Sequence, residues 1–316
     1  PMFMKLMTDA TEYELMGYWL AIGDRFDMVE SCNTALSRYE QTRPSDDTLA
    51  FTVDRVACFL DLNAKYEVAE RLYRRALAIR EKALGKEHPH TAQSLNTLAA
   101  LLYNKGDYEG AKKFNRRVLD ISEKALGKHH PQTAISLVFL ALLHESKGDY
   151  EVAEPLYRRA LAIYEKVLGK EHPDTAQILN NLALLLYRKG EYDGAEPLYR
   201  RALAIYEKVL GKEHPSTATN LNNLALHLYR KGDYDGAEPL NRRALDLYEK
   251  ALGKDHPHTA VSLNNLALLL YRKGNYEGAE QCLFNLAHLL RDKGDHIFST
   301  PVYLNILDIY IEIYNE

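Results

Sequence analysis

Residues 153–173 and 195–215 carry the same string of 21 residues, AEPLYRRALAIYEKVLGKEHP. Parts of this string recur along the chain at a step of 42 residues. The dipeptide His-Pro marks that step at residues 88–89, 130–131, 172–173, 214–215 and 256–257. Similarity of a chain to itself at a fixed period of about 20–50 residues indicates a repeat architecture, in which each repeat stacks on the next. The sequence therefore predicts an array of 42-residue repeats.

Each repeat is predicted to contain two helices. In the repeat at 174–212, apolar residues fall at steps of three and four over 175–189, which indicates the first helix. Gly190 follows it and suits the left-handed residue that ends many helices. The second helix is predicted over 192–210 and ends before Gly211.

The link between repeats carries helix-start signals. Pro215 suits the first turn of the following helix, because its missing N–H group would have no partner there. Ser216 or Thr217 is the expected cap of that helix. Pro197 falls early in a second helix, where it is expected to remove one backbone hydrogen bond.

A single hairpin of this kind cannot bury its apolar stripe, whereas stacked hairpins can. The predicted fold class is all-α: a right-handed superhelical solenoid of stacked antiparallel helix pairs, with about 14 helices. Residues 1–46 are expected to be a diverged N-terminal capping hairpin, and 47–275 the tandem repeats. The spacing changes after that, so 276–316 are expected to be irregular C-terminal capping helices. Within them, 276–292 should be one continuous helix, covered by a last helix at 300–314.

Composition argues against several classes of protein. The 316 residues carry a net charge of −4, without the basic excess of a protein that binds nucleic acid through phosphates. No apolar run reaches the roughly 18 residues of a membrane span, and the N-terminus lacks the pattern of a secretory signal. Cys32, Cys58 and Cys282 are scattered and form no CxxC pair. This usage suits a reducing compartment, so a cytoplasmic location is expected.

One short pattern in each repeat is specific to a family. In the repeat at 174–212 a glycine, a tyrosine two residues later and two alanines stand at fixed spacing: Gly190, Tyr192, Ala195 and Ala202. Gly-x-Tyr followed by alanines three and ten residues after the tyrosine is the signature of the tetratricopeptide repeat. The common unit of that family has about 34 residues, whereas the unit here is longer.

Two longer strings refine the resemblance. ALAIYEKVLGKEHPDTA at 160–176 and LNNLALLLYRKGEYDGAEPLYRRAL at 179–203 resemble the repeats of kinesin light chain and of nephrocystin-type proteins. The likeness covers about 47–282, most of the chain. The sequence contains no heptad coiled coil of the kind that joins a light chain to its motor, so the resemblance implies the cargo-binding repeat domain. It implies a protein that binds partners and is not an enzyme.

The resemblance further implies that the first helices line a concave groove. Rows of asparagine, leucine, tyrosine and arginine are expected to face it, because amides bond peptide backbones and tyrosine and arginine often dominate binding energy. The alternative is that the asparagines and tyrosines bond neighbouring helices. The predicted groove residues are Asn96, Tyr103, Asn180, Leu184, Tyr187, Arg188, Asn222, Leu226, Tyr229, Arg230, Asn264, Leu268, Tyr271 and Arg272.

The expected partner is a protein or an extended peptide, acidic and anchored by leucine or aromatic residues, with no role for nucleic acid or membrane. Glu145 interrupts the tyrosine row and is expected to set the polarity of an acidic ligand. The apolar segment 300–314 offers a surface for homo-oligomers.

Other candidate sites have simpler interpretations. The His-Pro histidines of successive repeats should lie about 10 Å apart, too far for ligands that converge to about 2.1 Å from zinc. No metal site or cofactor is therefore expected. The chain has no GxSxG, HExxH or glycine-rich phosphate loop, so no catalytic residues are predicted. Cys58 and Cys282 lie on apolar helix stripes and are expected to be core residues. The double arginines, such as Arg200 and Arg201, are expected on a solvated outer face.

Two functions remain open from the sequence. The first is a non-catalytic scaffold or adaptor that holds a protein or peptide in the groove. The second is a sensor or autoinhibitory arm of a larger signalling protein whose effector domain lies outside this chain.

Overall fold

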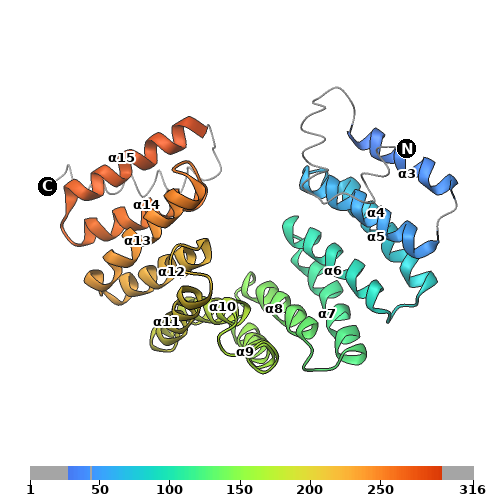
Figure 1. Cartoon of the computed structure of the whole chain (residues 1–316), viewed down its shortest axis with the longest axis horizontal. Coiled ribbons are helices and arrows are strands. Elements are labelled where there is room, and N and C mark those ends of the chain that lie inside the picture. Colours follow the sequence, from blue (N-terminus) through green and yellow to red (C-terminus); the bar gives the residue numbers. More distant parts are fainter. Residues whose placement is uncertain (1–27, 43–44, 294–316) are drawn as a thin grey trace. The chain divides into compact units, whose positions relative to one another are not determined.

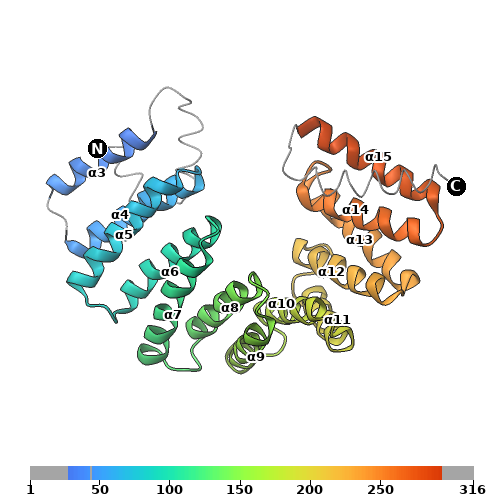
Figure 2. The same ribbon diagram turned by 180° about the vertical axis from the view of Figure 1, so that it is seen from behind.

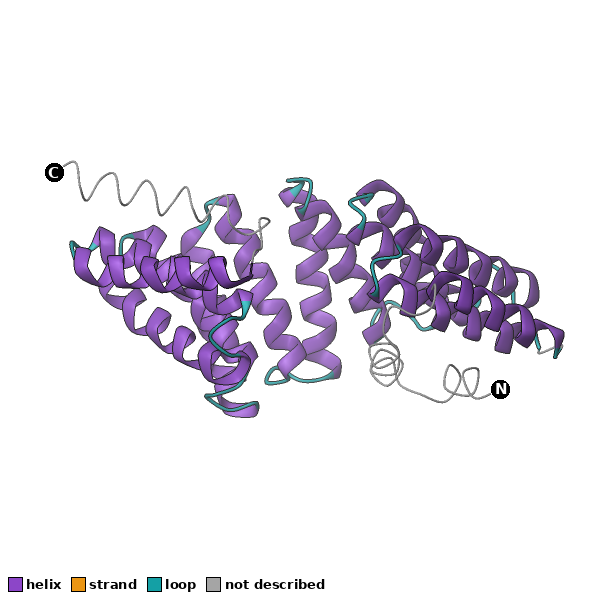
Figure 3. Cartoon of the chain, turned by 90° about the horizontal axis from the view of Figure 1, so that it is seen from above, coloured by secondary structure: helices purple, strands orange, loops and turns teal. Residues whose placement is uncertain are grey.

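The computed structural model of the protein describes residues 28–42 and 45–293. Over these residues the chain forms thirteen helices and no strand (Figure 3). The helices are α3 Met28–Gln41, α4 Asp46–Leu62, α5 Tyr66–Ala83, α6 Pro89–Asn104, α7 Tyr108–Ala125, α8 Pro131–Glu145, α9 Tyr150–Val167, α10 Pro173–Lys189, α11 Tyr192–Val209, α12 Pro215–Lys231, α13 Tyr234–Leu252, α14 Pro257–Arg272 and α15 Tyr276–Lys293. The prediction of an all-α solenoid of stacked helix pairs is confirmed.

The helices come in antiparallel pairs, one pair for each repeat (Figure 1). In the repeat at 174–212, α10 covers the predicted first helix and α11 the predicted second helix. Gly190 ends α10 with a φ of 82°, which a residue with a Cβ rarely adopts. Ala64 takes the corresponding place after α4 and also has a positive φ, of 57°.

A histidine, and not the expected Ser216 or Thr217, caps the first helix α12. His214 precedes Pro215, and its Nδ1 accepts a hydrogen bond of 3.1 Å from the N–H of Ser216. The hydroxyl of Thr217 instead donates to the carbonyl of Gly211, at 2.9 Å, so it ties the new helix to the link before it. The same histidine cap opens four more first helices, at His88, His130, His172 and His256. Each His-Pro pair is therefore a helix start.

The chain divides into two compact units, Pro1–Ile163 and Tyr164–Glu316, and the division falls within α9. In the first unit, the described helices α3 to α8 share one apolar core. In the second unit, α12 lies between α10 and α14, while α11 and α13 take the second-helix places (Figures 1 and 2). Fully buried alanines, among them Ala183, Ala195 and Ala202, allow these helices to approach closely.

The helix predicted over 276–292 is confirmed, because α15 is one continuous helix. It packs against α14, as a second helix does in the other repeats. The predicted last helix at 300–314, with its surface for homo-oligomers, lies outside the described residues. Of the predicted N-terminal hairpin, the structure describes only α3 and the start of α4.

Candidate peptide-binding rows

Twelve of the fourteen predicted groove residues lie on α10, α12 and α14, in the second unit. The other two, Asn96 and Tyr103, lie on α6 in the first unit. The structure therefore brings together three repeats of the predicted rows.

The asparagine row joins adjacent repeats. The Oδ1 of Asn180 accepts hydrogen bonds from the side-chain amides of Asn220, at 3.0 Å, and Asn223, at 3.2 Å. One repeat later, Asn222 Oδ1 accepts from Asn265 in the same way, at 3.1 Å. These oxygens are thus used between first helices, as in the alternative interpretation of the sequence, and Asn180 and Asn222 are themselves buried.

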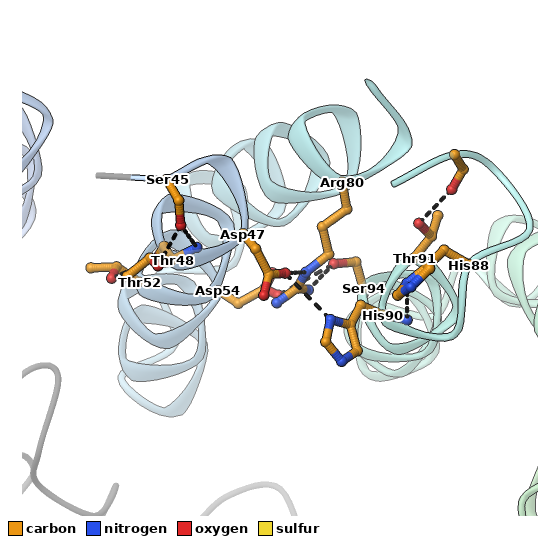
Figure 4. Close-up of polar contacts among 11 residues, drawn as sticks. Ser45, Asp47, Thr48, Thr52, Asp54, Arg80, His88, His90, Thr91 and Ser94 are labelled. Atoms are coloured by element: carbon orange, nitrogen blue, oxygen red, sulfur yellow. Dashed lines mark hydrogen bonds and ion pairs between the residues drawn. The ribbon is translucent and has the colours of Figure 1, made fainter. Parts of the chain in front are cut away.

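The ends of this row differ from its middle. On α14, the Oδ1 of Asn264 is buried and has no hydrogen-bond partner between Met28 and Lys293. On α4, Asp54 stands at the asparagine position, and its Oδ2 accepts from Ser94 Oγ at 3.2 Å and from the buried guanidinium of Arg80 (Figure 4). On α6, Asn96 is half-buried and makes no such bond to α8.

The tyrosine and arginine rows meet across one repeat boundary. The Nε of Arg230, on α12, donates a hydrogen bond of 3.1 Å to the hydroxyl of Tyr187, on α10. Each tyrosine of the row packs against the tyrosine that begins the next helix; the ring centroids of Tyr187 and Tyr192 are 5.7 Å apart. The rows therefore combine exposed arginines, half-buried tyrosines and half-buried leucines on three successive helices.

Two of the three lysines beside these arginines are held by carboxylates of the preceding second helix, and the third, Lys189, pairs with Glu191. Lys231 Nζ lies 3.0 Å from Glu196 Oε2 and 3.2 Å from Asp193 Oδ1. Its hydrogen bond is the main reason that the pKa of Glu196 is lowered. Lys273 has the same arrangement with Asp235 and Glu238. The arginines of the row stand at exposed positions beside these lysines.

Glu145 does not act as the sequence analysis expected. Its side chain is buried at the end of α8 and accepts a hydrogen bond of 2.9 Å from the hydroxyl of Tyr157. A carboxylate held inside the first unit cannot set the polarity of a ligand by facing it. The expectation is therefore wrong, because α9 supplies a buried donor that the row pattern does not reveal.

The double arginines have acidic partners, as predicted, but the second arginine of each pair reaches a different repeat. Arg200 pairs with Glu196 one turn earlier, at 2.9 Å. Arg201 instead pairs with Glu165 of the preceding second helix, at 2.7 Å. The same link recurs between Arg243 and Glu207. These partly exposed pairs lie on the outer face and each contributes little stability.

Cys282 is buried, as predicted, and so is Cys32, whereas Cys58 is half-buried against the core of the first unit. Burial raises the pKa of Cys282 and raises that of Cys32 to about 12, which disfavours the reactive thiolate. Within residues 28–42 and 45–293, no three His, Cys, Asp or Glu side chains gather as a metal site would require. No helix among these residues is long and apolar enough to cross a membrane.

Comparison with known proteins agrees with the repeat geometry. The tetratricopeptide repeat family matches residues 56–124, 93–166, 141–208, 174–250 and 216–283. These overlapping matches cover most of the chain, so the protein belongs to the tetratricopeptide repeat family. The repeat of this family is generally a non-catalytic scaffold that binds other proteins.

Three individual proteins illustrate what the chain is similar to. Nephrocystin-3 of Xenopus tropicalis is 42% identical over 93 residues, which are 28% of this chain and 7% of that protein. The crystal structure of BtubC (BKLC) from P. vanneervenii is 23% identical, with a TM-score of 0.61, and the match covers 74% of this chain and 91% of that one. The crystal structure of a putative kinesin light chain from Podospora anserina, with nearly identical TPR-like repeats, is 26% identical, with a TM-score of 0.57. That match covers 66% of this chain and 98% of the other.

Proposed function

We propose that this protein is an adaptor that holds an extended, acidic peptide segment of a partner protein along α10, α12 and α14. The bond between Arg230 and Tyr187 carries the proposal, because it fixes a cationic group beside an aromatic ring at the boundary of two repeats. Tyrosine and arginine are the side chains that most often dominate binding energy at interfaces.

The charge pattern supports an acidic ligand. Arg188, Arg230 and Arg272 occur once per repeat on exposed positions, while the adjacent Lys231 and Lys273 are paired with carboxylates. Arginines about 10 Å apart on packed helices are separated by about one Debye length at 0.1 M salt. Each can therefore attract a different carboxylate of an extended ligand.

Apolar contacts should supply most of the affinity. Leu184, Leu226 and Leu268 are half-buried and stand one turn before the tyrosine and arginine positions. Charged contacts chiefly orient a ligand and raise its rate of association, whereas burial of leucine and aromatic anchors lowers the rate of dissociation. A suitable probe is thus an acidic peptide that contains leucine and tryptophan.

The test measures binding of this probe by fluorescence anisotropy at rising salt concentration. A variant with Arg188, Arg230 and Arg272 changed to Glu should bind at least about tenfold more weakly, since a lost charged hydrogen bond costs about 1.5–3 kcal/mol. A control variant with Arg200, Arg242 and Lys250 changed to Glu has the same change in net charge on the outer face and should bind normally. Equal binding by the first variant and the wild type, or no effect of salt, would contradict the proposal.

A further inference from the structure

One position in the second helices differs sharply among the repeats. It holds Arg80 in α5, Ser122 in α7, Tyr164 in α9, Tyr206 in α11 and Tyr248 in α13. Four of these side chains are large, and one is small. The question is what fills the corresponding space beside Ser122.

In the second unit, the tyrosine fills this space. Tyr206 is 3% exposed, and its hydroxyl donates a hydrogen bond of 3.1 Å to the side chain of Gln177 on the first helix of the same repeat. Tyr248 donates in the same way to Thr219, at 2.8 Å, and its ring stacks on that of His258, with centroids 5.3 Å apart. The site thus takes an aromatic ring and offers its hydroxyl an acceptor.

In the first repeat of the first unit, the space is filled differently. Arg80 is 3% exposed and bonds Asp54 and Ser94, while His90 and Asp47 close the outer side (Figure 4). A polar network therefore occupies this space in place of the aromatic ring.

Beside Ser122 the space remains as a cleft of about 430 Å³ between α6, α7 and the start of α8. Its apolar wall includes Val118 and Ile121, and its polar rim includes Gln93, Asn96 and Gln132. Gln93 stands at the position of Gln177, yet its side-chain amide makes no hydrogen bond to any residue that the structure describes. The volume is ample for a ring, since an apolar cavity of about 150 Å³ already takes up benzene.

We propose that this cleft binds a tyrosine side chain of a partner protein. The bound tyrosine would take the position that Tyr206 has in its own repeat. Its ring would pack against Val118 and Ile121, and its hydroxyl would donate a hydrogen bond to the side chain of Gln93. The cleft is lined by His90 and His130 but by no lysine or arginine, so it lacks the permanently charged side chains that usually bind a phosphate or a carboxylate. The inference uses the protein-binding role of the family and does not depend on the arginine row, so either proposal can fail without the other.

The test uses two probes on the full chain, 4-methylphenol and the blocked tripeptide acetyl-Gly-Tyr-Gly-amide. Methyl NMR signals of Val118 and Ile121 should shift with both probes. The variant Ser122→Tyr places the side chain of the sister repeats in the cleft, so it should melt at a higher temperature and lose binding of both probes. The corresponding phenylalanine tripeptide should bind roughly fivefold more weakly than the tyrosine one, the value of one net hydrogen bond. Gln93→Ile should remove that difference.

A reciprocal variant provides the control. Tyr206→Ser should open the same cleft between α10, α11 and α12, and 4-methylphenol should restore part of the lost thermal stability. The proposal is overturned if the wild-type signals do not shift, or if Ser122→Tyr still binds the probes. Binding of 4-methylphenol without binding of the tripeptide would also overturn it, because the occupant would then be a small phenol. Self-association that Ser122→Tyr abolishes would assign the cleft to a second copy of this chain instead.

Discussion

Two regions of the molecule bury a basic side chain and treat it in opposite ways. In the first unit, Arg80 between α4 and α6 is 3% exposed and bonds both Asp54 and Ser94. In the second unit, His227 on α12 is fully buried, and neither of its ring nitrogens has a hydrogen-bond partner within the residues described. Arg80 thus has a carboxylate from its own repeat and a hydroxyl from the next, whereas the helices packed around His227 supply it with no hydrogen-bond partner among the described residues.

The surroundings of His227 explain why the neutral form of its imidazole is favoured. Its ring lies among those of Tyr187, Tyr192 and Tyr199, with centroids 5.8–6.2 Å away. Burial lowers the pKa of His227, and the carboxylate of Glu196, 3.9 Å from Nε2, opposes this only in part. The neutral imidazole is favoured, and it occupies a place that leucine fills on α6, α8, α10 and α14.

The largest change in stability is expected when Arg80, whose Nη1 is hydrogen-bonded and whose Nε is not, loses the carboxylate of Asp54. Asp54→Ala leaves the buried guanidinium of Arg80 without its main counter-charge, which typically costs about 3–5 kcal/mol. Hydrogen exchange of α4 to α6 measures this loss locally. Asp47→Ala, at a half-exposed carboxylate 3.9 Å from Arg80, should cost less than about 1 kcal/mol. Similar losses in both variants would show that Asp54 does not provide the essential contact.

A gain in stability, and not a loss, is expected when His227 is replaced. His227→Leu replaces an imidazole without partners by the side chain of the sister repeats, so it should stabilise the second unit by about 1–3 kcal/mol. Urea unfolding measures the change. Leu185→His makes the reverse substitution one repeat earlier on α10 and should destabilise by a similar amount. A destabilised His227→Leu variant would mean that the buried imidazole has a partner, such as a bound water molecule.

The difference in the free energy of unfolding between the wild type and His227→Leu should also depend on pH. Because the folded pKa of His227 is lowered, the unfolded chain takes up its proton first, near pH 6.5. The stability that neutral His227 retains is therefore complete above that pH and is lost as pH falls toward the folded pKa. The leucine variant lacks this term, so its advantage should grow in acid. A constant advantage from pH 8 to about pH 5 would contradict the lowered pKa.

The smallest change in stability is expected in a comparison of two asparagines of the same row. Asn180→Ala leaves the amides of Asn220 and Asn223 without their acceptor and should cost about 1–2 kcal/mol. Asn264→Ala removes an oxygen that is buried without a partner, so the change should be close to neutral. Thermal unfolding of the two variants provides the measurement. Equal losses would show that the bonds between first helices do not distinguish these positions.

The helices could be predicted because single residues mark their ends. Gly190 and Pro215 act locally, so the sequence places α10 and α11 within two residues of their true ends and also gives the start of α12. The role of the asparagines could not be read in this way, because their partners are 40 and 43 residues away, in the next repeat. Aligning the repeats would have shown both His227 and Ser122, since His227 replaces a leucine found on α6, α8, α10 and α14, and Ser122 a tyrosine found at three of its four sister positions. Whether Ser122 leaves an open cleft depends on the packing of three helices, which the alignment does not contain.

The link from each second arginine to the glutamate of the preceding repeat has an evolutionary consequence. Arg201 with Glu165 and Arg243 with Glu207 have the same separation of 36 residues. A gene rearrangement that adds or removes a whole 42-residue unit would therefore rebuild every such link at the new junction. Recombination between the identical strings at 153–173 and 195–215 produces such a change. Gain or loss of one unit is therefore expected to preserve the pairing between repeats while it changes the length of the array.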